Sequence, residues 1–134
     1  LFQMYEEGKF VPWSLERTLE NLKTAVIKYR QNEISVIRMG LHPDPSMLEN
    51  YVDGPYHPSL RYLVDCRIGL DEMIEQIKGF DGLTDTVKFK FPSRSTSIYI
   101  GHKRENLQKL KEMFHLENII MQPDNDCDQL QLIA

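Results

Sequence analysis

The sequence predicts an α/β fold in two parts: a helix–strand unit typical of a parallel α/β sheet, followed by a small α+β module. An amphipathic stripe over residues 15–31 is followed, after a short turn, by the β-branched-rich run Ile34–Met39, an order typical of parallel α/β proteins. Further on, the strictly alternating segment Val87–Phe91 indicates a half-buried strand and is followed by a second amphipathic stripe. We expect the two parts to occupy residues 1–80 and 81–134.

The first part opens on what resembles the end of a helix, closed by Gly8, so we expect the chain to be an excerpt of a longer protein. Ser14 is a good N-cap, and a stripe at helical spacing follows it, made of Leu15, Leu19, Leu22, Val26 and Tyr29. The run Ile34–Met39 is then expected to be a strand covered on both faces.

A long loop rich in proline and glycine follows, with its densest parts at Gly40–Pro45 and Asp53–Pro58. Loops of this length inside a domain are usually functional. His42, Tyr56 and His57 are therefore candidates for lining a substrate cavity, built jointly with residues outside the chain.

No metal site is expected, because the spacing of His42, His57 and the neighbouring aspartates matches no ligand pattern. Cys66 and Cys127 lie far apart without a Cys-x-x-Cys pair, so we expect reduced thiols and no cluster held by this chain. No catalytic residue is assigned.

Apolar residues continue at helical spacing from Leu60 to Ile77, and Gly79 is a plausible helix end. Because glycine costs about 1 kcal/mol inside a helix, Gly69 predicts a break or bend. Residues 80–83 form a short apolar joint to the second part.

In the second part, Lys88 and Lys90 alternate with the apolar residues of the predicted strand, which Pro92 ends. A helix is expected after Gly101, with strands at residues 118–122 and 129–133.

Positive charge is concentrated in this second part, although the chain as a whole carries −4. Residues 86–111 hold seven lysines and arginines against the single acid Glu105, which points to an anionic partner. A glycine before a helix lets backbone amides approach a phosphate. The nucleic-acid-binding candidates are Gly101, His102, Lys103, Arg104, Lys88, Lys90 and Arg94.

The segment Ile100–Leu107, between the expected strands of residues 84–134, resembles the Gly-x-x-Gly loop of the K-homology (KH) module. In that family the loop clamps the backbone of single-stranded nucleic acid. Arg104 replaces the second glycine of the motif.

Residues 1–78 resemble the C-terminal part of radical S-adenosylmethionine (radical SAM) proteins related to the elongator catalytic subunit. The motifs that carry the resemblance are Leu1-Phe-x-x-Tyr5, Gly8-Lys-Phe-x-Pro12, Ser14-Leu-Glu16, Val36-Ile-Arg-Met-Gly-Leu41 and Gly54-Pro-Tyr-His-Pro58. The resemblance implies the last helix and strand of a partial parallel α/β barrel. It also implies an iron–sulfur cluster and S-adenosylmethionine in the full-length parent, held upstream of this chain, with no cofactor in the chain itself.

The first expectation is therefore a cytoplasmic C-terminal portion, inert by itself, that joins an upstream radical SAM domain of the same chain and docks RNA, possibly tRNA. The alternative is a structural extension that caps the barrel or mediates dimerisation of an enzyme acting on a small molecule or tetrapyrrole. A free-standing binding module is a third reading. No membrane partner is expected.

Overall fold

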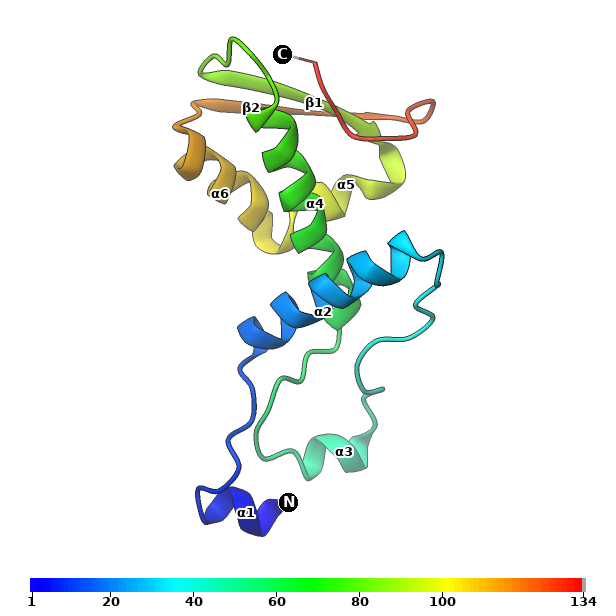
Figure 1. Ribbon diagram of the computed structural model, residues 1–134, viewed down its shortest axis with the longest axis vertical. Helices are drawn as coiled ribbons and strands as arrows, with labels where there is room; N and C mark the ends of the chain where they lie inside the picture. The colour runs from blue at the N-terminus through cyan, green and yellow to red at the C-terminus, as the bar shows by residue number, and fades with distance from the viewer. Residues whose placement is uncertain (134) are drawn as a thin grey trace. The chain divides into compact units, whose positions relative to one another are not determined.

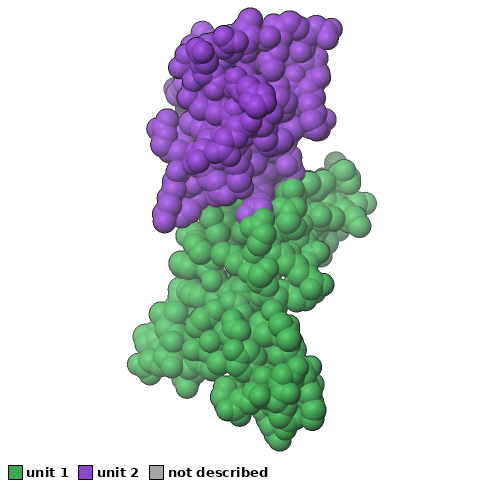
Figure 2. All heavy atoms as spheres, turned by 90° about the vertical axis from the view of Figure 1, so that its left-hand side faces the viewer, with its two compact units in different colours: residues 1–64 green, residues 65–134 purple. Residues whose placement is uncertain are grey.

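The computed structural model describes residues 1–133 and divides into two compact units, residues 1–64 and 65–134 (Figure 2). The division lies inside a long helix rather than at the joint of residues 80–83. The mixed α/β class that the sequence predicts is confirmed. The boundary between residues 80 and 81 stays a prediction.

Unit 1 contains short helices and connecting segments around one longer helix (Figure 1). Its elements are α1 (Phe2–Glu6), α2 (Leu15–Gln31), α3 (Pro45–Glu49) and the start of α4 (Leu60–Lys78). The predicted N-cap of α2 is confirmed, because the hydroxyl of Ser14 accepts a hydrogen bond of 3.2 Å from the Arg17 amide. Gly8 follows α1 with a φ of +69°, as expected of a glycine that ends a helix.

The predicted strand Ile34–Met39 does not form. The segment lies between α2 and α3 and pairs with no strand among residues 1–133. The Ile37 side chain is 96% exposed, and the Val36 carbonyl is held by the Arg61 guanidinium at 3.0 Å. The prediction was wrong for a physical reason: a strand exists only with a neighbour, and the part of the chain that the structure describes supplies none.

Apolar exposure is a general property of unit 1. Its buried apolar side chains are Leu19, Val26, Leu60 and Val64. Its exposed large apolar side chains are far more numerous, namely Leu1, Phe2, Met4, Phe10, Val11, Trp13, Tyr29, Ile34, Ile37, Leu41, Leu48, Tyr51 and Val52. This unit therefore has a small core and a broad apolar surface.

Helix α4 runs without interruption from Leu60 to Lys78, so the predicted break at Gly69 is wrong. A Cβ at Gly69 would lie 3.0 Å from Cγ2 of Ile98 and 3.2 Å from Cδ1 of Tyr99. The missing side chain of Gly69 therefore lets the segment that contains Ile98 and Tyr99 pack closely against α4. No helix within residues 1–133 has the length and apolar character needed to cross a bilayer.

Unit 2 is a three-stranded sheet, as far as the described residues go, with helices on one face (Figure 1). Strand β1 (Thr86–Pro92) lies between β2 (Asn118–Asp124), which is parallel to it, and the short antiparallel β3 (Gln131–Leu132). The connection from β1 to β2 consists of η1 (Ser93–Ser95), α5 (Thr96–Ile100), η2 (His102–Arg104) and α6 (Glu105–Phe114). The predicted strand, the helix after Gly101 and the two later strands form in the predicted order, whereas helix α5 was not predicted.

The alternation of β1 divides the sheet into a buried and an outward face. Val87, Phe89 and Phe91 are at most 1% exposed and belong to a core completed by Met73, Ile77, Tyr99, Leu110, Leu116 and Leu130. The Phe91 and Tyr99 rings lie 5.2 Å apart and tilted, which adds an aromatic contact to this core. Because side chains alternate along a strand, Lys88 and Lys90 project from the face opposite the helices.

Candidate functional site

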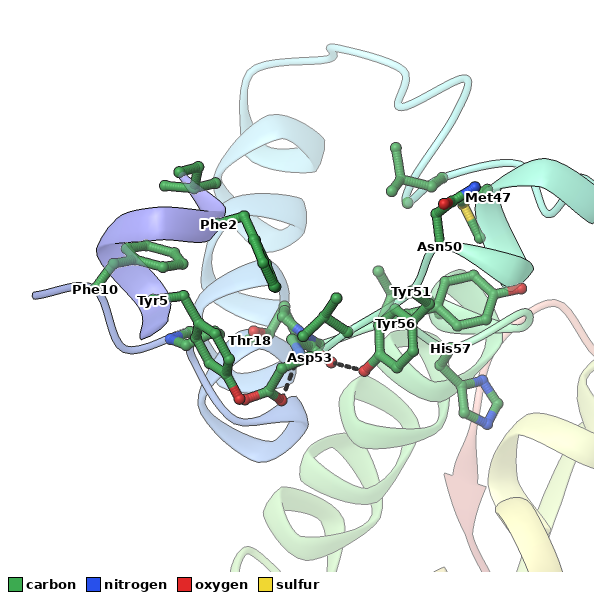
Figure 3. Close-up of a pocket in the computed structure, with 18 of the residues that line it drawn as sticks. Phe2, Tyr5, Phe10, Thr18, Met47, Asn50, Tyr51, Asp53, Tyr56 and His57 are labelled. Atoms are coloured by element: carbon green, nitrogen blue, oxygen red, sulfur yellow. Dashed lines mark hydrogen bonds between the residues drawn. The ribbon is translucent and has the colours of Figure 1, made fainter. Parts of the chain in front are cut away.

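A pocket of about 660 Å³ is formed within unit 1 (Figure 3). Its walls come from α1 and the segment after it, from α2 and from the loop that follows α3. Most lining residues are apolar or aromatic; Phe2, Tyr5 and Phe10 lie on one side and Tyr51 and Tyr56 on the other. Mainly apolar pockets of this volume with a few polar groups are typical of small-molecule sites.

The polar groups of the pocket centre on Asp53. Its carboxylate accepts a 2.7 Å hydrogen bond from the Gly54 amide and lies beside the Tyr5 hydroxyl, as Figure 3 shows. A hydrogen bond from the Tyr5 hydroxyl to Asp53, together with the negative charge of that carboxylate, raises the pKa of Tyr5 above its ordinary value. The Tyr51 hydroxyl donates a hydrogen bond to the Gly54 carbonyl at 2.6 Å, which closes the turn of residues 51–54. The contact between Asp53 and Tyr5 connects this turn to α1.

The structure separates the three residues proposed for a substrate cavity. Tyr56 and His57 line the pocket, whereas His42 is exposed and is not among the lining residues. The Nδ1 atom of His57 accepts a hydrogen bond of 3.0 Å from the Ser59 amide, which leaves Nε2 as the nitrogen that carries the proton in the neutral ring. From the sequence, Asp53 was considered only as a metal ligand and Tyr5 only as part of a family motif, because their proximity depends on the fold.

The predicted phosphate loop lies between α5 and α6 in unit 2. Gly101 has a φ of +82°, and both Lys103 (+50°) and Arg104 (+64°) have left-handed backbone. A Cβ at Gly101 would lie 2.7 Å from Cγ of Asn106, so glycine is required there by the fold itself. The side chains of Lys103 and Arg104 are exposed beside the first turn of α6.

Asn106 is the buried polar residue beneath this loop, with 4% exposure. Its Nδ2 atom donates to the Cys66 carbonyl at 2.9 Å and to the Ile98 carbonyl at 3.1 Å. These bonds connect α6 to α4 and α5 and hold the turn in place. This role could not be predicted from the sequence, since asparagine is mostly exposed in folded proteins.

The basic residues predicted to extend the phosphate field do not form one surface. Lys88 and Lys90 project from the outward face of the sheet, while Figure 1 shows the α5–α6 turn at the end of the helical layer remote from that sheet. Lys90 pairs with Asp124 at 2.8 Å, which raises the pKa of Lys90 and lowers the pKa of Asp124. Arg94 lies in η1, at the carboxyl end of β1, and is exposed.

Other positive charges near the loop also have partners. Lys109 pairs with Glu105 one helical turn away at 2.6 Å, and Lys111 donates to the Glu117 carbonyl at 2.7 Å. Of the basic residues predicted to bind phosphate, Lys103 and Arg104 are therefore the two that lie next to the start of α6.

The described residues include no group of three or more His, Cys, Asp or Glu side chains placed to hold a metal ion. Cys66 and Cys127 are both buried and free. An iron–sulfur cluster needs three or four thiolates, so the residues of this chain do not fit one.

A family model described as the Radical_SAM C-terminal domain matches residues 1–69. The chain has no significant match among curated proteins, and none among solved structures. The family match covers unit 1, including all residues that line the pocket. This chain therefore belongs to the family of radical SAM C-terminal domains.

Proposed function

We propose that the chain is the non-catalytic C-terminal portion of a radical SAM enzyme, and that it docks both the upstream catalytic domain and an RNA substrate. The family implies an iron–sulfur cluster and S-adenosylmethionine in the full protein. Both would be bound upstream of this chain. The motifs of residues 1–78 resemble the elongator-related branch, which modifies tRNA.

The observation that carries the docking of the catalytic domain is the unpaired segment Ile34–Met39. It is rich in β-branched residues, has no regular secondary structure, and follows a well-formed amphipathic helix. Burying a side chain such as Ile37 is worth about 1.5–3 kcal/mol, so leaving it 96% exposed is unfavourable. A neighbouring strand of a parallel α/β barrel would pair the backbone of this segment and cover its side chains.

The test of this docking is the variant Ile37→Asp in the intact protein. A charge in a covered strand opposes burial by several kcal/mol, so limited proteolysis should cleave residues 34–39 in the variant and spare them in the wild type. Met113→Asp is the control, since Met113 is exposed on α6. Equal cleavage of wild type and Ile37→Asp would contradict the proposal.

The RNA-docking part of the proposal is supported by the loop of residues 101–104. It presents two exposed cations beside the amino-terminal turn of the ten-residue helix α6, where the helix dipole favours an anion. The KH-like order of strand, helix, loop, helix and strand supports the same reading. Arg104 stands where the KH motif has its second glycine and adopts a left-handed φ that glycine would adopt freely.

The RNA proposal is tested by tRNA binding at several salt concentrations, with Lys103→Glu and Arg104→Glu. Each lost phosphate contact should lower the slope of log affinity against log salt by about 1. Lys28→Glu, on α2 in unit 1, makes the same charge change outside the loop and should leave the slope unchanged. Absent binding, or binding that does not depend on salt, would remove RNA from the proposal and leave the docking of the catalytic domain standing.

A structural role for unit 2 is the second candidate, favoured by the outward face of its sheet. Ile120 and Ile133 are 48% and 40% exposed there, on either side of Lys88. In this case unit 2 would cap the barrel or mediate dimerisation in an enzyme that acts on a small molecule or tetrapyrrole. A sedimentation coefficient that rises with concentration, and that Ile120→Asp abolishes, would favour this candidate over RNA docking.

A further inference from the structure

The pocket of unit 1 combines aromatic walls with one carboxylate. Five of the residues that line it are phenylalanines or tyrosines, Phe2, Tyr5, Phe10, Tyr51 and Tyr56. His57 adds an imidazole ring, and Asp53 is the one acid among the described lining residues. In Figure 3 Asp53 lies between the two groups of rings. The faces of such rings carry partial negative charge and attract cations.

The Asp53 carboxylate has acceptor capacity to spare. A carboxylate offers about four lone-pair positions, and the Gly54 amide and the Tyr5 hydroxyl use two of them. Both of these donors are uncharged groups at pH 7, and the residues that line the pocket include no lysine or arginine. A bound cation would supply a positive charge for the carboxylate to pair with.

We propose that this pocket binds an organic cation, an ammonium group carried on a planar or apolar body. The ammonium would lie against Asp53, and the body would lie among the rings of Phe2, Phe10 and Tyr51. The volume of about 660 Å³ suits a small molecule. An anion would be repelled by Asp53, and a single carboxylate does not make a metal site.

This site is independent of the RNA proposal, because every residue that lines it belongs to unit 1. It is also independent of the unpaired segment, since none of the residues 34–39 lines the pocket. Its ligand could be the substrate of the parent enzyme or a separate effector; both share the same cationic chemistry.

The experiment uses a series of three probes of similar shape and different charge on the intact protein. These are 2-phenylethylammonium, the neutral 2-phenylethanol and the anionic 3-phenylpropanoate, with affinities measured by ligand-observed NMR titration. Contact with rings and with a carboxylate should favour the cation over the alcohol by about tenfold, and the anion should bind weakest. Competition by the substrate of the parent enzyme would identify the ligand as substrate; lack of competition would identify an effector.

Two variants assign the effect to Asp53. Asp53→Asn removes the charge and should leave only the smaller preference for the cation that the rings supply, whereas Tyr5→Phe keeps the charge and should preserve the full preference. Glu49→Gln removes an acid of unit 1 that does not line the pocket and should change nothing. No saturable binding of the cation, equal binding of the three probes, or a preference that Asp53→Asn leaves undiminished would each overturn the proposal.

Discussion

Replacing Gly101 with alanine tests whether the turn between α5 and α6 is built on Asn106. Two costs add at this position. Gly101 has a φ of +82° and a ψ of 163°, a region almost restricted to glycine, and alanine there costs about 1–3 kcal/mol. The new Cβ would also lie 2.7 Å from Cγ and 2.9 Å from Oδ1 of Asn106, so that side chain must move.

Movement of Asn106 endangers its hydrogen bonds to the Cys66 and Ile98 carbonyls. Leaving one buried acceptor without a partner costs about 1–3 kcal/mol. The two terms together predict a loss of about 2–6 kcal/mol, a large share of the roughly 5–15 kcal/mol by which a domain is typically stable.

Gly82→Ala supplies the matched control. Gly82 also has a left-handed φ of +85°, but nothing lies within 4 Å of the Cβ that alanine would add. It should therefore cost only the backbone term of about 1–2 kcal/mol. Urea unfolding monitored by circular dichroism gives both free energies, and a Gly101→Ala cost no larger than that of Gly82→Ala would refute the reasoning.

Three further predictions concern unit 2. Arg104→Gly relieves a left-handed φ of +64° and should raise the free energy of unfolding by up to about 1 kcal/mol while weakening RNA binding, as urea unfolding and salt titrations would show. Gly69→Ala improves helix propensity by about 1 kcal/mol but brings a Cβ to 3.0 Å from Ile98, so we expect a net loss in thermal unfolding; a net gain would contradict the close packing. The ion pair of Lys90 and Asp124 should stabilise the fold at pH values between the pKa of Asp124 and the pKa of Lys90. The folded pKa of Asp124 is lowered, so its contribution to stability is lost as the pH falls through that folded pKa. The folded pKa of Lys90 is raised, so its contribution is lost as the pH rises through the folded pKa of Lys90. Asp124→Asn should therefore flatten the acid side of the stability profile, and an unchanged profile would contradict the pairing.

Elements with one buried face could be predicted from the sequence. Helix α2, strand β1 and helix α6 each bury a stripe or an alternating set of apolar residues, so the local pattern carries the information. Helix α3 was missed, although Asp44 followed by Pro45 is a recognisable start; the Asp44 carboxylate accepts from the Met47 amide at 2.8 Å.

Features that depend on distant residues could not be predicted. The partner of Lys90 follows from the parallel register that places Asp124 opposite Pro92, and nothing in the local pattern of β1 contains that register. The same holds for Gly69, whose neighbour Ile98 comes from another segment. Tyr5 and Asp53 are likewise brought together only by the fold of unit 1.

The unpaired segment shows the limit of pattern reading most clearly. Ile34–Met39 has the composition of a buried strand, yet Ile34 and Ile37 are 54% and 96% exposed. Composition reports what a segment can pair with and not whether the partner is present.

The docking of this chain on a catalytic domain is tested most directly by amide hydrogen exchange of residues 34–39 in the intact protein. Pairing with a neighbouring strand should slow the exchange of alternate amides by about a thousandfold relative to an exposed segment, and Ile37→Asp should restore fast exchange. Exchange in the intact wild type that is as fast as in an exposed loop would contradict the account.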